Sequence, residues 1–166
     1  MTRIPKIWKI IIIYVAAIYL TLPVMRAFLN FLYSSIGRRN LAVSIDIVLF
    51  VIPCLILFLF LKKGVVRSAI VITPLIAALI FIYQMERPEE RVHFLEYGIL
   101  GFLVSTATGT GSRHLIRALL LIVLIGSVDE FIQLLLPNRV GDLRDVLMNA
   151  TGGVLGLWVE KFWSRR

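Results

Sequence analysis

Polar and ionisable residues recur at helical spacing inside the hydrophobic stretches of the second half of this chain. His93, Glu96 and Tyr97 share one face of a helix, because residues three and four positions apart lie on the same side. Glu130 and Gln133 share a face of a later hydrophobic segment in the same way. A histidine beside carboxylates can accept or donate protons near neutral pH. Ionisable groups at membrane depth are costly and usually mark a working site, so these faces predict one.

The adjacent acids Asp129 and Glu130 predict only one carboxylate at that site. Consecutive residues of a helix point about 100° apart, so we expect Glu130 to face a narrow site and Asp129 to face elsewhere. Glu130 lies about 9 Å inside the predicted helix end at 1.5 Å per residue. It would form a structural ion pair with Arg139 or Arg144, or act as an acid, base or ligand.

Glu96 and Tyr97 each have a structural alternative to a role in the site. Glu96 would pair with a basic residue of the same site. Tyr97 would anchor its helix at the membrane interface, where tyrosine and tryptophan are enriched. The sequence leaves both alternatives open.

The last hydrophobic segment carries its polar and small residues on one stripe. Asp142 predicts a helix N-cap, with Asp145 in a capping-box-like position. Asp145, Asn149, Gly152 and Gly156 follow at spacings that keep them on one face. Gly152 and Gly156 form a GxxxG pair, which lets a second helix approach closely. The stripe would thus carry Asp145 and Asn149 into a helix interface.

Other chemical motifs are missing from the sequence. Cys54 is the single cysteine and lies in a hydrophobic run, which predicts a small buried apolar residue. No Cys or His pair has zinc spacing, and there is no Gly-rich phosphate loop, nucleophile elbow or HExxH. We therefore expect no cofactor and no dedicated metal site, although carboxylates could hold a hard cation.

The composition is that of an integral membrane protein. Of 166 residues, 59% are hydrophobic and the mean hydropathy is +0.90, against about 45–50% apolar residues in soluble domains. The apolar runs are long enough to cross a ~30 Å hydrocarbon core. We predict a single domain over residues 1–166, an all-α polytopic transmembrane bundle of six spanning helices. These are expected at 7–23, 44–61, 66–84, 92–107, 115–136 and 143–163. Residues 25–43 predict an amphipathic piece along the headgroup plane or a loop capping the bundle.

The distribution of charge predicts the orientation in the membrane. Six spans put both termini on one side, and the excess of Lys and Arg on that side assigns it to the cytoplasm. Every acidic residue except Glu160 falls on the opposite side, which indicates chemistry at the outer face. The net charge of +8 is spread among hydrophobic runs, so nucleic acid is not an expected partner.

The second half of the chain resembles the VanZ-like family of membrane proteins. The resemblance covers residues 85–160. It rests on the following positions: His93 and Tyr97, Asp129, Glu130 and Gln133, then Arg139, Asp145, Asn149, Gly152 and Gly156. It implies a multi-pass envelope protein of the bacterial plasma membrane, and the family's founding member is linked to resistance to teicoplanin-type, lipid-bearing glycopeptides. The resemblance implies no particular reaction.

Three functions are compatible with the sequence. The leading hypothesis is binding of an envelope lipid, or of the antibiotic itself, at the outer leaflet. The candidate binding residues are Glu96, Tyr97, Gln133, Arg139, Arg144 and Asn149. The second is a hydrolase or transferase acting on a lipid-linked envelope intermediate, with His93, Glu130 and Asp145 catalytic only in that case. The third is a structural or partner-recruiting role. The sequence leaves open whether the chain forms a homo-oligomer.

Overall fold

The described part of the chain is built entirely from α-helices. The computed structural model describes residues 5–85, 88–109, 111–137 and 143–164. Its helices are α1 (Lys6–Ile36), α2 (Arg38–Leu61), α3 (Val65–Tyr83), α4 (Pro88–Thr108), α5 (Ser112–Leu135) and α6 (Leu143–Ser164). The predicted all-α bundle of six helices is confirmed over these residues.

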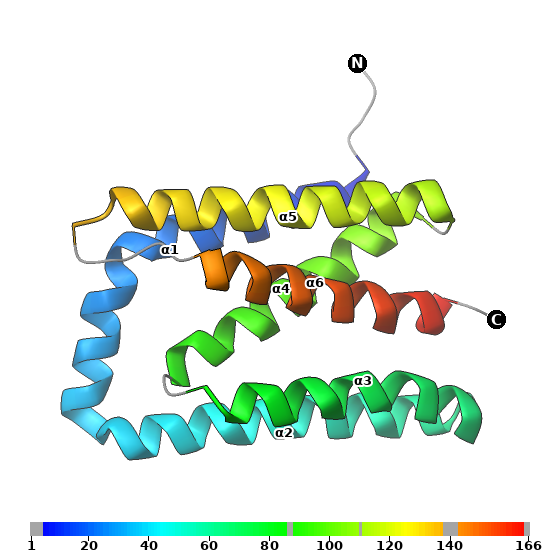
Figure 1. The fold of residues 1–166 in the computed structure, drawn as a ribbon, viewed down its shortest axis with the longest axis horizontal. Coiled ribbons are helices and arrows are strands. Elements are labelled where there is room, and N and C mark those ends of the chain that lie inside the picture. Colours follow the sequence, from blue (N-terminus) through cyan, green and yellow to red (C-terminus); the bar gives the residue numbers. More distant parts are fainter. Residues whose placement is uncertain (1–4, 86–87, 110, 138–142, 165–166) are drawn as a thin grey trace.

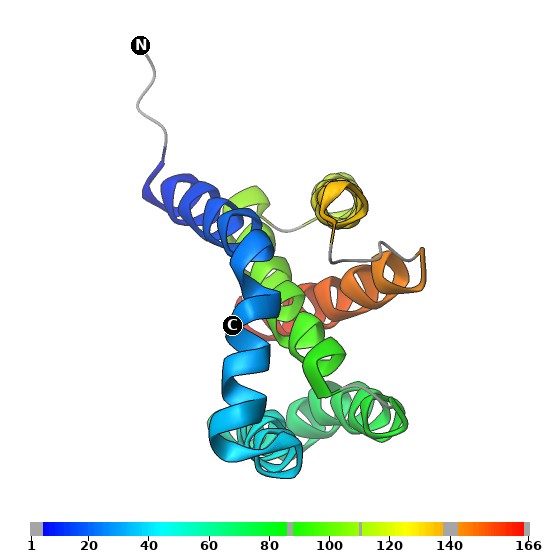
Figure 2. The same ribbon diagram turned by 90° about the vertical axis from the view of Figure 1, so that its left-hand side faces the viewer.

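The helices form three layers. The first part of α1 lies with α5 on one side, α4 and α6 cross in the middle, and α2 and α3 form the opposite side (Figure 1). The view along the bundle shows the same order, with α5 and the α2–α3 pair separated by α4 and α6 (Figure 2). The central position of α4 and α6 buries some of the polar residues that they carry, among them Tyr97 and Asn149.

Among the described residues, four of the six helices that were expected to span a membrane are long and apolar enough to do so by length and composition: α1, α2, α3 and α5. The outer pair α2 and α3 buries little of its surface, with 11% and 17% of their most apolar windows buried. Their exposed apolar side chains would otherwise meet water, so these helices are suited to contact lipid. Cys54 lies on α2 and is exposed, so the prediction of a buried cysteine was wrong.

The first helix is longer than the sequence indicated. It continues through Pro23 and ends at Ile36, where Gly37 adopts a left-handed φ of 80° before α2 begins. A proline removes one helical hydrogen bond and bends a helix without necessarily ending it. The second part of α1 runs across the end of the bundle instead of along it (Figure 1). Residues 25–36 are therefore helical, and the alternative of an irregular loop is wrong there.

Glycines allow α4 and α6 to cross with their backbones in contact. A Cβ placed on Gly156 would lie 1.9 Å from the carbonyl oxygen of Gly98, and one on Gly101 would lie 2.1 Å from that of Gly153. A Cβ on Gly152 would lie 2.7 Å from the carbonyl oxygen of Phe94. Atoms cannot approach this closely, so only glycine fits at these three positions. The crossing fixes how the amino-terminal halves of α4 and α6 face α5.

Candidate functional site

The candidate residues come from three helices that meet at one end of the bundle. The first turns of α4 and α6 and the last turns of α5 lie at the same end (Figure 1). We call the following seven side chains the polar cluster: His93, Glu96 and Tyr97 on α4, Asp129, Glu130 and Gln133 on α5, and Asn149 on α6. Asp129, Glu130, Gln133 and Asn149 are all buried.

Asp129 is the hydrogen-bonding centre of the polar cluster. Its Oδ2 accepts a 2.9 Å hydrogen bond from the hydroxyl of Tyr97, and its Oδ1 accepts one of 3.3 Å from Nε2 of Gln133. The same Nε2 donates a 3.1 Å hydrogen bond to Oε1 of Glu130. Gln133 therefore connects the two neighbouring carboxylates, and Tyr97 connects them to α4.

This arrangement corrects the expectation that Asp129 faces away from the site. Asp129 is fully buried and Glu130 is only 4% exposed. Asp129 and Glu130 do leave the helix about 100° apart. Gln133 lies four residues after Asp129 and three after Glu130, so its side chain reaches both. Asp129 was missed as a site residue although its i, i+4 spacing to Gln133 was visible in the sequence.

His93 brings further charge to the polar cluster. Its Nδ1 lies 3.4 Å from Oε2 of Glu96, within ion-pair distance. The carboxylates of Glu96, Asp129 and Glu130 all interact electrostatically with the imidazole. A histidine held among acids can act as a proton acceptor or donor, and the acids can bind a ligand that carries amine, amide or hydroxyl groups.

Two tyrosines of α1 hold the helices that carry these groups. The hydroxyl of Tyr14 donates to the carbonyl oxygen of Glu96 at 3.1 Å, and that of Tyr19 donates to the carbonyl oxygen of Ile125 at 2.8 Å. The first part of α1 therefore fixes both α4 and α5 beside the polar cluster.

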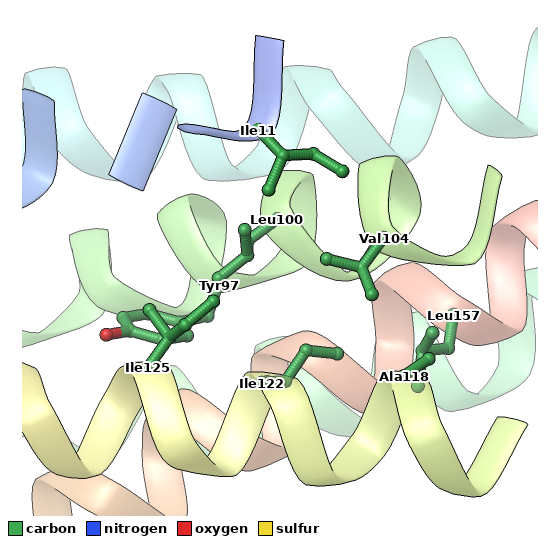
Figure 3. Close-up of a cluster of buried hydrophobic side chains, with 8 residues drawn as sticks. All are labelled: Ile11, Tyr97, Leu100, Val104, Ala118, Ile122, Ile125 and Leu157. Carbon is green, nitrogen blue, oxygen red and sulfur yellow. The ribbon is translucent and has the colours of Figure 1, made fainter. Parts of the chain in front are cut away.

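Tyr97 is fully buried, so the alternative that it anchors α4 at the interface is wrong. Its ring belongs to an apolar layer with Leu100, Val104, Ile122 and neighbouring residues, while its hydroxyl points out of that layer (Figure 3). The apolar layer therefore lies against one side of the polar cluster, on the side of the Tyr97 ring.

Asn149 is fully buried and its amide is unpartnered within the described residues. Neither Oδ1 nor Nδ2 has a hydrogen-bond partner there. A Cβ placed on Gly126 would lie 3.2 Å from Cβ of Asn149 and 3.4 Å from Cε1 of Tyr97, so these two side chains pack on the same glycine. Buried amides normally form hydrogen bonds, so the unpartnered amide of Asn149 is an exception within this part of the chain.

The remaining candidate residues lie at the rim. Arg144 is exposed, and its Nη2 lies 3.4 Å from Oε2 of Glu90 on α4. Asp145 lies in the first turn of α6 and is half-buried. Arg139 and Asp142 lie outside the described residues. Gly152 and Gly156 lie at the crossing of α6 with α4.

A second charged pair was missed by sequence reasoning. Nη1 of Arg91 on α4 lies 2.5 Å from Oδ1 of Asp46 on α2, and its Nη2 donates to the carbonyl oxygen of Met85 at 2.7 Å. The pair is separated by 45 positions, and no spacing rule could have joined it. It fastens α4 to the α2–α3 layer on the side away from α5.

No ready-made metal centre is visible within the described ranges, where no group of three His, Cys, Asp or Glu side chains is placed to hold an ion. The side chains of the polar cluster can form hydrogen bonds to a ligand, and three carboxylates beside one imidazole favour a ligand that donates hydrogen bonds.

Comparison with known families agrees with this architecture. A model of the VanZ/LLP1 family matches residues 7–164, well beyond the 85–160 region that carries the recognisable residues. Comparison with curated proteins and with solved structures gives no significant match. Because the family match spans nearly the whole chain, this membrane protein belongs to the VanZ/LLP1 family.

Proposed function

We propose that the protein binds a lipid-linked molecule at the outer leaflet of the bacterial plasma membrane through its polar cluster. The molecule is an envelope lipid or a lipid-bearing glycopeptide of the teicoplanin type, and its binding confers resistance to that antibiotic. The observation that carries the proposal is the buried network of Tyr97, Asp129, Gln133 and Glu130. Burying two carboxylates among apolar helices is costly, which supports a use beyond packing.

The chemistry of the polar cluster supports such a ligand. Its carboxylates and the unpartnered amide of Asn149 match the hydroxyl, amide and amine groups of a sugar- or peptide-bearing head. At the rim, the exposed guanidinium of Arg144 suits a phosphate or carboxylate. The apolar outer faces of α2 and α3 are suited to contact the lipid portion of the ligand, which can then remain in the bilayer. The charge bias of the sequence supports the outer location.

The test is antibiotic protection by matched variants. Glu130→Gln keeps an acceptor for Gln133 but removes the charge, and His93→Ala removes the imidazole. Both should abolish protection against a lipid-bearing glycopeptide while the amount of protein in the membrane stays unchanged. Glu160→Gln is the matched control, because Glu160 is also buried but bonds to Ser105, about 16 Å along α6 from Asn149 at 1.5 Å per residue. Full protection in both cluster variants would reject the proposal.

The placement of His93 favours a second candidate, a membrane-embedded hydrolase or transferase. His93 would act as a general base oriented by Glu96, 3.4 Å away. The substrate would be a lipid-linked envelope intermediate. Purified protein incubated with labelled envelope lipids would then form product in proportion to intact protein, and the His93→Ala variant would not. If the lipid binds but no product forms, this second candidate is rejected and only the binding function remains.

A further inference from the structure

The opposite face of α4 borders an apolar cavity of about 420 Å³. Its walls come from α2, α3, α4 and α6, and none of the residues that line it is ionisable. The volume lies within the range of roughly 300–1,000 Å³ that is typical of ligand sites. No residue of the polar cluster lines this cavity, so α4 separates two sites of contrasting chemistry.

The cavity has the length of one lipid leaflet. It extends from Leu49 to Phe60 along α2 and from Gly152 to Trp163 along α6. Each stretch rises about 16 Å at 1.5 Å per residue, which is about half of a ~30 Å hydrocarbon core. A long, narrow and apolar space of this kind suits a single extended hydrocarbon chain.

Positive charge marks one end of the cavity. Trp163 lines the cavity, and Nζ of Lys63 lies 4.0 Å from the centre of its ring and donates to its carbonyl oxygen. Lys62 and Lys161 lie over the rings of Phe58 and Trp158 nearby along the chain. Tryptophan and lysine together are typical of the membrane interface, and lysines there attract anionic headgroups.

We propose that this cavity holds one acyl chain of an anionic membrane lipid, with the lipid phosphate beside Lys63. The occupant is a bilayer component and not a segment of protein, because the cavity matches one leaflet in length, its lining is apolar, and a lysine lies beside its Trp163 end. This site is distinct from the polar cluster and does not depend on the function proposed above.

The test is photo-crosslinking of the full-length protein in vesicles. The probe is phosphatidylglycerol with a diazirine in the middle of one acyl chain, compared with phosphatidylcholine that carries the same chain. Label should appear on peptides of α2, α4 and α6 that line the cavity, and phosphatidylglycerol should label them about fivefold more strongly.

Two matched pairs of variants test where the acyl chain and the headgroup of the lipid lie. Ala78→Phe fills the cavity from α3 and should reduce the label about tenfold, whereas Ala77→Phe, on the exposed side of the same helix, should not. Lys63→Glu should remove the preference for phosphatidylglycerol, whereas Lys9→Glu, the same change of charge on α1, should keep it. Unchanged circular dichroism would verify that each variant is folded.

Several results would overturn the proposal. Equal labelling of the Ala78→Phe and wild-type proteins would show that the acyl chain of the lipid lies elsewhere. Equal labelling by both lipids would remove the anionic headgroup site. Crosslinks from cavity residues to a second copy of the chain, without lipid label, would make the cavity an oligomer interface. Antibiotic protection is not a readout here, so failure of this proposal and failure of the proposed function can be told apart.

Discussion

The hydroxyl of Tyr97 on α4 donates a 2.9 Å hydrogen bond to Oδ2 of Asp129 on α5, and neither side chain is exposed. Tyr97→Phe keeps the ring in the apolar layer but removes the donor. We expect the free energy of unfolding to fall by about 1–2 kcal/mol, since hydrogen bonds between membrane helices contribute up to ~1.7 kcal/mol. Steric-trapping measurements in bicelles would give this value.

A double-mutant cycle with Asp129→Ala isolates the pair, because alanine leaves no acceptor for the Tyr97 hydroxyl. The coupling energy should be at least about 0.5 kcal/mol. Tyr83→Phe is the control, because Tyr83 is 47% exposed, and it should change stability by less than about 0.5 kcal/mol. A coupling energy of zero would mean that the hydrogen bond does not hold α4 to α5.

Asn149→Leu separates a ligand-binding role from a structural one. An unpartnered buried amide costs about 1–3 kcal/mol, so a leucine of similar size should raise the free energy of unfolding by about 1 kcal/mol. Protection against the antibiotic should nevertheless be lost, because the ligand loses the amide. Met148→Leu, at the adjacent buried position, should alter neither quantity. A variant that is stabilised and fully protective would assign Asn149 no role in binding.

The glycine crossing predicts opposite outcomes for two similar substitutions. Gly156→Ala would place a Cβ 1.9 Å from the carbonyl oxygen of Gly98, so α4 and α6 must separate. We expect a loss of at least about 2 kcal/mol in the free energy of unfolding. Gly98→Ala meets its nearest atom, the carbonyl oxygen of Gly152, at 3.7 Å, and should cost less than about 1 kcal/mol. Thermal unfolding in detergent measures the stability of both variants. Equal stability of the two would contradict this packing.

Cysteine labelling would determine the orientation predicted from charge. In a Cys54→Ala background, Ser35→Cys and Ser112→Cys place a thiol at exposed positions at the two ends of the bundle. A membrane-impermeant maleimide should label Ser35→Cys in intact cells and Ser112→Cys only after permeabilisation. The reverse pattern would place the polar cluster at the cytoplasmic face.

Much of this architecture could be read from the sequence because hydrophobic length and helical spacing are local properties. The expected bounds of α3, α5 and α6 agree with the structure to within about three residues, and the shared face of Glu130 and Gln133 follows from spacing alone. The expected end at Pro23 was wrong for a physical reason: a membrane helix tolerates a proline, because neighbouring groups can satisfy the freed backbone carbonyl.

The remaining features depend on contacts between distant parts of the chain. The pairing of Arg91 with Asp46 and the contacts of Gly98 and Gly101 with α6 are set by how the helices cross. Rotating a helix by one residue would change them without altering the hydrophobic pattern. Asp129 has a different explanation. The Gln133 side chain is long enough to reach both Asp129 and Glu130, although these two acids point in different directions from the helix.

The apolar layer below the polar cluster also has a consequence for the host cell. Leu100, Val104 and Ile122 are fully buried, and Tyr97 closes the layer toward the acids. Leu100, Val104 and Ile122 carry no group that could pass a proton from Asp129 and Glu130 across this layer. Proton exchange at the polar cluster should therefore not drain the transmembrane proton gradient of a cell that produces the protein.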